Sequence, residues 1–290
     1  MSGLGPFFES YYRLRPVNAT FTGVHQHDDR LPDWSPEGLA AAADEMRSLR
    51  ASLGDGELDA AAGLGDVERR DRQLAASFLD VQIAEIEGLH FQRGNPSLAL
   101  AEAVFGVISL ITRPFAPAVR RSAALAVRLQ AIPAFLAGAR RSMVHGVPDQ
   151  WRARCLQECE GATRLLRDGV GRWLAFESLA DDPVRDGCAK AMRAVDDYRR
   201  WLTQEVPAAP AARLAIGSAF FDLLLRRGHH CTRGAAALAA DASGALDDAL
   251  EMLERRARAI TAGGYVEVQA RLAEAHPTVA DYLATYQRAW

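Results

Sequence analysis

One long apolar segment constrains the fold more than any other part of this sequence. Residues 98–112 read Leu-Ala-Leu-Ala-Glu-Ala-Val-Phe-Gly-Val-Ile-Ser-Leu-Ile-Thr, and Glu102 is the only charged residue among them. Asn95 and Pro96, just before the segment, are residue types that favour a helix N-cap and a first helical position. The segment therefore predicts a helix that is buried nearly all round, with other helices packed against it.

Amphipathic segments before and after this helix predict the elements that cover it. Ser35-Pro36-Glu37 is a helix start, and the apolar stripe that follows it ends at Gly54. Pro183 opens a later helix whose stripe runs from Val184 to Leu202. Pro133 lies inside a further helical pattern and predicts a kink or a split there.

Because no segment alternates like a strand, we predict an all-α protein, a bundle-like array of roughly ten helices. We expect one domain over residues 1–290, with possible subdivision near residue 147 and at 207–216.

Composition excludes several classes of partner. The chain has a formal net charge of −3, so it has no global positive field for nucleic acid or an anionic membrane. Its first residues lack the basic and apolar regions of a signal peptide, and we find no apolar run of ~18 residues. Four cysteines in 290 residues fit a reducing compartment. We therefore predict a cytoplasmic protein without a nucleic-acid or membrane partner.

The candidate binding residues lie in a segment, 17–35, that we predict to be a polar loop. It contains His25, His27, Asp28 and Asp33, all residue types that can ligate a divalent metal. The competing interpretation is a loop whose polar side chains hydrogen-bond to its own backbone and to helix ends. We keep these four residues as candidate binding residues and predict no metal site.

A second metal alternative involves cysteine. Cys155 and Cys159 are one helical turn apart, and Cys188 with His229-His230-Cys231 could complete a zinc site. Cys155 and Cys188 also fall on apolar stripes, where cysteine behaves as a small hydrophobic residue. None of the seven histidines is followed by Glu, so the chain has no His-Glu-x-x-His motif, and it has no P-loop or Gly-x-Ser-x-Gly motif. We predict no catalytic residues.

Seven stretches, taken in order, resemble the bacterial domain of unknown function eight-eight-five family over nearly the whole chain. They are Pro16-x-x-Ala19-Thr20-x-x-Gly23-x-His25-x-x-Asp28-x-x-Leu31-x-Asp33-x-Ser35, Arg70-Asp71-Arg72, Asn95-Pro96, Leu110-Ile-Thr-Arg113-x-Phe115-Ala116-Pro117, Arg128-Leu129-x-Ala131-Ile132-Pro133, Tyr198-x-x-Trp201-Leu202 and His276-Pro277-Thr278.

This resemblance implies an all-helical fold like that of zinc metallopeptidases, with the zinc motif in a C-terminal half that lies beyond this sequence. The chain would then be the N-terminal, scaffold half of a metallopeptidase-like hydrolase, inactive alone and without a cofactor. Zinc would be expected only in a full-length family member. The alternative is a stand-alone helical binding module for a small ligand, a peptide or a protein.

The end of the sequence bears on this choice. A predicted helix carrying Tyr282, Tyr286 and Trp290 stops on an aromatic residue without a polar tail, which favours a truncated homologue or one half of a divided gene. A scaffold half should expose a large apolar face. We expect that face to include these three aromatic residues and to bind a complementary C-terminal half or another protein.

Overall fold

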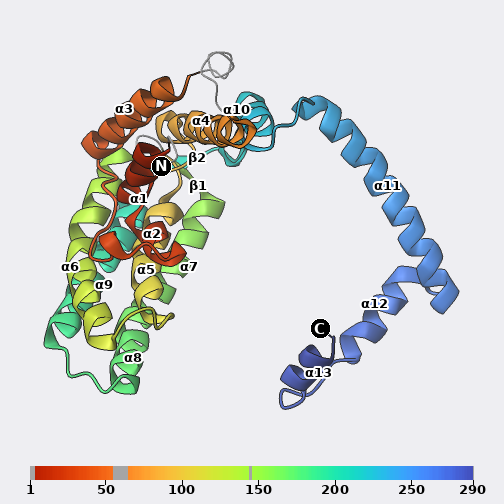
Figure 1. Cartoon of the computed structure of the whole chain (residues 1–290). Coiled ribbons are helices and arrows are strands. Elements are labelled where there is room, and N and C mark those ends of the chain that lie inside the picture. The colour runs from red at the N-terminus through yellow and green to blue at the C-terminus, as the bar shows by residue number, and fades with distance from the viewer. Residues whose placement is uncertain (1–3, 55–64, 144–145, 290) are drawn as a thin grey trace. The chain divides into compact units, whose positions relative to one another are not determined.

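The computed structural model describes residues 4–54, 65–143 and 146–289, and most of these are helical (Figure 1). Contacts divide the chain into two compact units, one ending at His230 and one beginning at Cys231. The first unit contains α1 Gly5–Leu14, α2 Pro16–Thr22, η1 His25–His27, α3 Pro36–Leu53, α4 Asp66–Glu87, α5 Pro96–Ile111, α6 Ala118–Ser142, β1 Val147–Pro148, α7 Asp149–Arg164, η2 Leu165–Gly169, α8 Val170–Phe176, α9 Asp182–Gln204, β2 Ala208–Ala209, η3 Ala211–Leu214, α10 Ser218–Leu223 and η4 Leu224–Gly228. The second contains α11 Ala235–Ile260, α12 Gly264–Glu274 and α13 Tyr282–Ala289. The all-α prediction is confirmed, whereas the single domain over 1–290 and its subdivision stay predictions.

Helix α5 lies in the main core, as its sequence predicts. Asn95 caps it by accepting a hydrogen bond from the Ser97 backbone N–H at 3.1 Å. Helices α5, α6, α7 and α9 pack together, and Leu100, Leu110, Leu129 and Leu202 are almost completely buried among them. The expected burial nearly all round is confirmed, since Phe105, which is 53% exposed, is the one exposed residue of α5.

A second, smaller core is formed by α1, α3 and α4. Leu39 and Met46 of α3 pack against Leu79 and Ile86 of α4 in this cluster. The predicted start of α3 is confirmed, since the Ser35 hydroxyl accepts from the Gly38 N–H at 3.0 Å and Gly54 follows the last helical residue. Trp34 packs against both clusters and therefore lies between the two cores.

Two predictions about breaks in the chain need correction. The segment 17–35 is not a continuous loop: α2 occupies Pro16–Thr22, because Pro16 is pre-set for the first helical turn and Val17, Ala19 and Thr20 are buried by tertiary packing. Helix α6 is not split at Pro133 but continues from Ala118 to Ser142, so the split is excluded and the kink stays a prediction. Burial of Leu129, Ile132 and Leu136 stabilises the helix around the missing backbone donor.

The structure also contains a short pairing that the sequence did not indicate. Val147-Pro148 pairs in parallel with Ala208-Ala209, and Val147 is completely buried. This two-residue ladder joins the start of α7 to the segment after α9. Two-residue strands are too short to give an alternating pattern.

Helix α6 is long and apolar enough to cross a membrane by composition, with a mean hydropathy of 1.4 over 18 residues. Half of that window is buried inside the protein, and the helix carries the fully buried Arg128. The same composition is found in core helices of folded proteins, and the packing of α6 against α5 and α9 accounts for it here.

Candidate functional site

Three of the four predicted binding residues, His25, His27 and Asp28, lie around a buried arginine, Arg128, that was not predicted as a site residue. Arg128 of α6 has no solvent-exposed surface. Its guanidinium donates to the carbonyls of Arg30 (2.9 Å), Gly106 (2.9 Å), Pro16 (3.1 Å) and His27 (3.2 Å), and to the hydroxyls of Ser109 (3.0 Å) and Thr20 (2.7 Å). All three nitrogens of the guanidinium therefore donate hydrogen bonds, and these bonds connect residues 16–30 to α5 and α6.

His25 and Asp28 complete this network from the outside. The Asp28 carboxylate accepts from the Thr20 hydroxyl at 2.7 Å and lies 3.1 Å from His25 Nδ1. The His25 ring stacks on Phe115 with the ring centroids 3.8 Å apart. Burial lowers the pKa of Arg128 to about 10, although Asp28 and Glu102 act in the opposite direction. These contacts give His25 and Asp28 a structural role as anchors of the segment.

His27 and Asp33 are placed differently. The backbone carbonyl of His27 belongs to the Arg128 network, whereas its Nδ1 is buried and has no hydrogen-bond partner in the described part of the chain. Asp33 accepts from the Ser35 N–H at 2.9 Å, two residues before α3, and does not join His25 or Asp28. Asp33 instead lines a cavity between the two cores, together with Glu102 and Gln92.

None of these groups forms a metal site within residues 4–54, 65–143 and 146–289. No three His, Cys, Asp or Glu side chains in these ranges are placed to hold one ion. Cys155, Cys159 and Cys188 are buried, and all three lie among the apolar residues of the main core, as the apolar stripes predicted for Cys155 and Cys188. Cys231 is partly exposed in the other unit. The residues described here therefore do not fit the zinc ion of a metallopeptidase.

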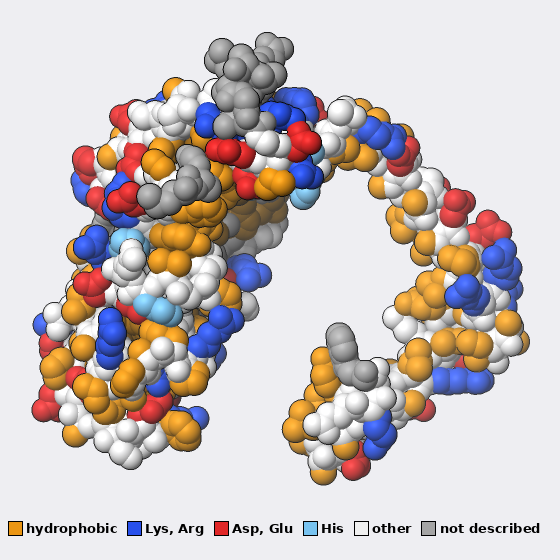
Figure 2. Space-filling view, in the orientation of Figure 1, with side chains coloured by type: hydrophobic (Ala, Val, Ile, Leu, Met, Phe, Trp, Pro, Cys, Tyr) orange, Lys and Arg blue, Asp and Glu red, His pale blue; other side chains and the backbone are white. Residues whose placement is uncertain are grey.

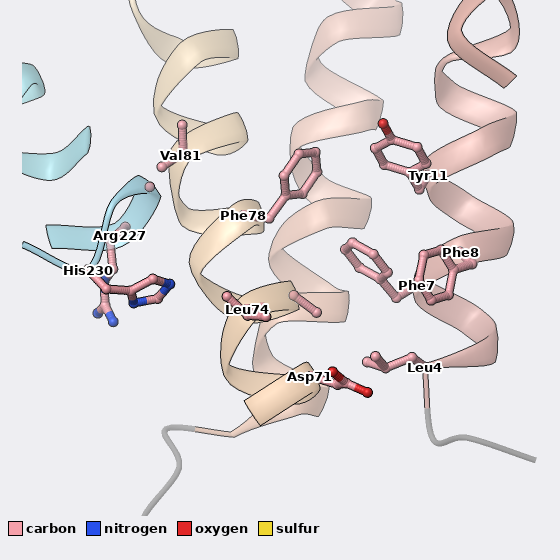
Figure 3. Close-up of a pocket in the computed structure, with 12 residues that line it drawn as sticks. Leu4, Phe7, Phe8, Tyr11, Asp71, Leu74, Phe78, Val81, Arg227 and His230 are labelled. Carbon is pink, nitrogen blue, oxygen red and sulfur yellow. The ribbon is translucent and has the colours of Figure 1, made fainter. Parts of the chain in front are cut away.

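An apolar groove of about 590 Å³ lies beside the N-terminal helix α1. Phe7, Phe8 and Tyr11 of α1 face Phe78 of α4, and Figure 3 shows these rings together. The Phe7 and Phe78 rings meet edge-on at 5.9 Å, and Tyr11 lies 5.4 Å from Phe78.

Charged groups lie at the edges of this groove. Arg227 and His230, which follow α10, stand beside α4 with Asp71 at its first turns (Figure 3). Arg227 is held by Asp80 of α4, with Nε and Oδ2 3.1 Å apart. We call this feature the aromatic groove. Its apolar wall and polar edge are typical of sites that bind small molecules.

The fold and these features define an all-helical protein with two packed cores, an aromatic groove and a cavity between the cores, and with no recognisable catalytic constellation in its described residues. The sequence matches a family of bacterial proteins of unknown function, DUF885, over residues 16–290. The chain belongs to this family, which is the one that its sequence resembles.

A solved structure with the same fold comes from Shewanella oneidensis and is described as a putative lipoprotein of unknown function. The two chains align with a TM-score of 0.71 and 19% sequence identity, over 86% of this chain and 46% of the other. This chain therefore spans less than half the length of that protein. No curated protein matches the sequence. The likeness establishes the fold.

Proposed function

We propose that this chain is a helical scaffold that binds a complementary polypeptide through the exposed apolar side chains of α11–α13. In this proposal the partner corresponds to the remaining part of the longer DUF885 fold. The pair would form a metallopeptidase-like hydrolase whose zinc site lies in the partner, so this chain alone would be inactive.

The observation that carries the proposal is the exposure of large apolar side chains in the unit after His230. We call them the C-terminal apolar surface: Leu246 (57% exposed), Leu250 (53%), Leu253 (40%), Val266 (76%), Leu272 (66%), Tyr282 (58%), Leu283 (69%) and Tyr286 (54%). Figure 2 shows hydrophobic side chains along these helices. Trp290, also expected here, lies outside the described residues.

The pattern along α11 supports a missing partner. Leu246, Leu250 and Leu253 recur at the spacing of one helix face, which in a folded protein normally contacts a core. The described residues of this unit bury very little of that face, and Ala257 is the buried apolar residue of α11. Exposed apolar surface of this kind marks protein interaction sites.

The proposal can be tested by mixing the purified chain with the C-terminal part of a longer DUF885 protein and measuring the mass of the product by light scattering. We expect a one-to-one complex. Replacing Leu246, Leu250 and Leu253 by Ser should weaken the complex at least about tenfold, because each leucine buries apolar surface. Val119→Ser with Val127→Ser on exposed positions of α6 is the matched control.

A complex that survives the triple serine variant would overturn the proposal, as would failure of the two parts to associate. Zinc measured in the complex, and absent when the partner's histidines are replaced, would support the hydrolase-like part of the proposal. A complex without zinc would reject that part and leave a binding scaffold.

The aromatic groove favours a second function, a module that binds an apolar small molecule. Its aromatic wall suits a flat apolar body, and Arg227, which pairs with Asp80 but is half-exposed, places positive charge at the edge for an anionic group. The probe 1-anilinonaphthalene-8-sulfonate has both features. We expect saturable fluorescence enhancement that falls at least about fivefold in affinity in Phe78→Ala and is unchanged in Phe176→Ala, which is exposed elsewhere. Equal binding to both variants would exclude the groove as the site.

A further inference from the structure

The cavity that contains Asp33 lies where the two cores of the first unit meet. It has a volume of about 340 Å³ and is enclosed by side chains from α1, α2, α3, α4 and α5 and from the segment before α3. Leu39, Met46 and Ile86 line it from the smaller core, and Glu102 lines it from α5. Its volume falls in the range of sites that hold small organic molecules.

Glu102 forms no hydrogen bond and no salt bridge within the described ranges, although Arg128 and Arg15 act on its charge. It is the only charged residue in the sixteen residues of α5, where burial of a carboxylate is costly. Burial raises the pKa of Glu102 to about 7, and the charges of Arg128 and Arg15 only partly offset this effect. A buried acid without a hydrogen bond or salt bridge, lining a cavity, is typical of a functional site.

A second acceptor at the same cavity is also unsatisfied. Oε1 of Gln92 is buried and accepts no hydrogen bond from the described residues. A buried acceptor without a donor carries a free-energy penalty that a ligand N–H group could remove. Glu102 and Gln92 come from different segments, so the cavity presents two oxygen acceptors on its wall.

The arginines that line the cavity, by contrast, already have partners. Arg13 pairs with Glu45, and Arg15 donates to the side chain of Gln82 and lies over the rings of Tyr11 and Phe78. Arg30 lies 3.8 Å from Asp29. The unsatisfied groups of the cavity are therefore acceptors, and a ligand that completes it must supply donors.

We infer that this cavity binds a small organic amine, with its ammonium group between Glu102 and Gln92 and its apolar body against Trp34, Leu39 and Met46. The ammonium group supplies three N–H donors and one positive charge, which satisfy a carboxylate and an amide oxygen together. The apolar walls select an aliphatic or aromatic body over a polar one. The inference does not depend on the C-terminal apolar surface or on the aromatic groove.

The test uses n-hexylamine as the probe and hexanoate as its anionic counterpart of similar size. Calorimetric titration of the full chain at pH 7 should show saturable binding of hexylamine, at least about tenfold tighter than hexanoate. About half of the Glu102 carboxyls are protonated at this pH, so binding of the ammonium form should release about half a proton per site. Titration in two buffers with different ionisation enthalpies measures that release.

Two variants and one control locate the site. Glu102→Gln should weaken hexylamine binding at least about tenfold and abolish proton release. Gln92→Leu should weaken binding but leave the proton release unchanged. Glu37→Gln removes an exposed carboxylate that pairs with Arg141 and should change neither quantity. Circular dichroism of Glu102→Gln checks that the helices are intact, and loss of a buried charge is not expected to unfold them.

Three results would overturn the inference. They are the absence of saturable hexylamine binding, equal affinity in the wild type and Glu102→Gln, and tighter binding of hexanoate than of hexylamine. The last result would mean that the arginines, and not the two acceptors, determine what the cavity holds.

Discussion

The guanidinium of Arg128 donates to the hydroxyl of Thr20 at 2.7 Å, although 108 residues separate the two in the chain. The same hydroxyl donates to the carboxylate of Asp28 at 2.7 Å, so Thr20 links Arg128 of α6 to Asp28 by two hydrogen bonds. Pro16, Thr20, His25, Asp28, Phe115 and Arg128 all belong to the stretches that resemble the DUF885 family. In three dimensions the three stretches that contain these residues form one connected network.

Replacing Arg128 by Met should destabilise the protein by about 3–5 kcal/mol, because it leaves several buried carbonyls without donors. Urea unfolding followed by circular dichroism measures the change in the free energy of unfolding. Arg199→Met, at an exposed position paired with Asp196, should cost less than about 1 kcal/mol. Similar losses in the two variants would contradict the anchoring role of Arg128.

Zinc affinity should not depend on the histidines of the His25–Asp28 segment. His25 lies beside one carboxylate, and the described residues provide no third ligand there. Calorimetric titration with zinc should therefore give the same weak or absent signal for the wild type and for His25→Ala with His27→Ala. A stoichiometric uptake lost in the double variant would instead establish a metal site in this segment.

The thiols should differ sharply in reactivity. Cys155, Cys159 and Cys188 are buried, and burial raises the pKa of Cys188 to about 11. Cys231 is partly exposed. A disulfide reagent such as DTNB should therefore modify one thiol per native chain quickly, and four after unfolding. Cys231→Ser should remove the fast phase, and a fast phase that persists in this variant would show that a core cysteine is accessible.

Stability should fall as pH rises through the range in which Glu102 ionises. Its pKa is raised from 4.5 to about 7 in the folded protein, so the folded state holds this proton more tightly than the unfolded state. The contribution is fully present below pH 4.5 and is lost as pH rises towards and through 7. The total is on the order of 3 kcal/mol.

Urea unfolding at pH 4.5 and pH 8 checks this expectation through Glu102→Gln. The variant should gain stability relative to the wild type between these pH values, because glutamine has no proton to lose. Glu37→Gln is the control, since a backbone hydrogen bond and Arg141 lower the pKa of Glu37 and confine its effect to acidic pH. A constant difference between wild type and Glu102→Gln would show that Glu102 ionises alike in both states.

Much of the fold follows from local patterns in the sequence. The stripe from Val184 to Leu202 predicted the buried face of α9, and Ser35-Pro36 predicted the start of α3. These signals depend on neighbours within a few residues. Helix α2 was missed because its seven residues are stabilised by contacts with α5 and Arg128, which are distant in sequence. The exposure of Phe105 could not be predicted, because an apolar run does not indicate which side of a helix faces the core.

The candidate site was predictable only in part. His25 and Asp28 do lie together, but their partner Arg128 was not identified. Arg128 follows Leu125 and precedes Ile132 at helical spacing, so an arginine on an apolar stripe was the available signal. Asp33 was predicted to join the histidines, but it lies apart from them and lines the cavity between the two cores. Its carboxylate accepts from the Ser35 N–H in an Asx turn, which directs the side chain towards α3. No pattern in the sequence indicated that Oε1 of Gln92 would be buried without a hydrogen-bond donor.

The distance in sequence between Thr20 and Arg128 has a consequence during synthesis. Residues 16–30 leave the ribosome about 100 residues before α6. Until α6 is synthesised, their carbonyls lack the hydrogen bonds from Arg128, and the apolar side of α2 lacks its packing partners. The beginning of the chain is therefore expected to become native late. A nascent chain stalled before residue 128 should show helix α3 protected from proteolysis and the segment around Thr20 still cleavable.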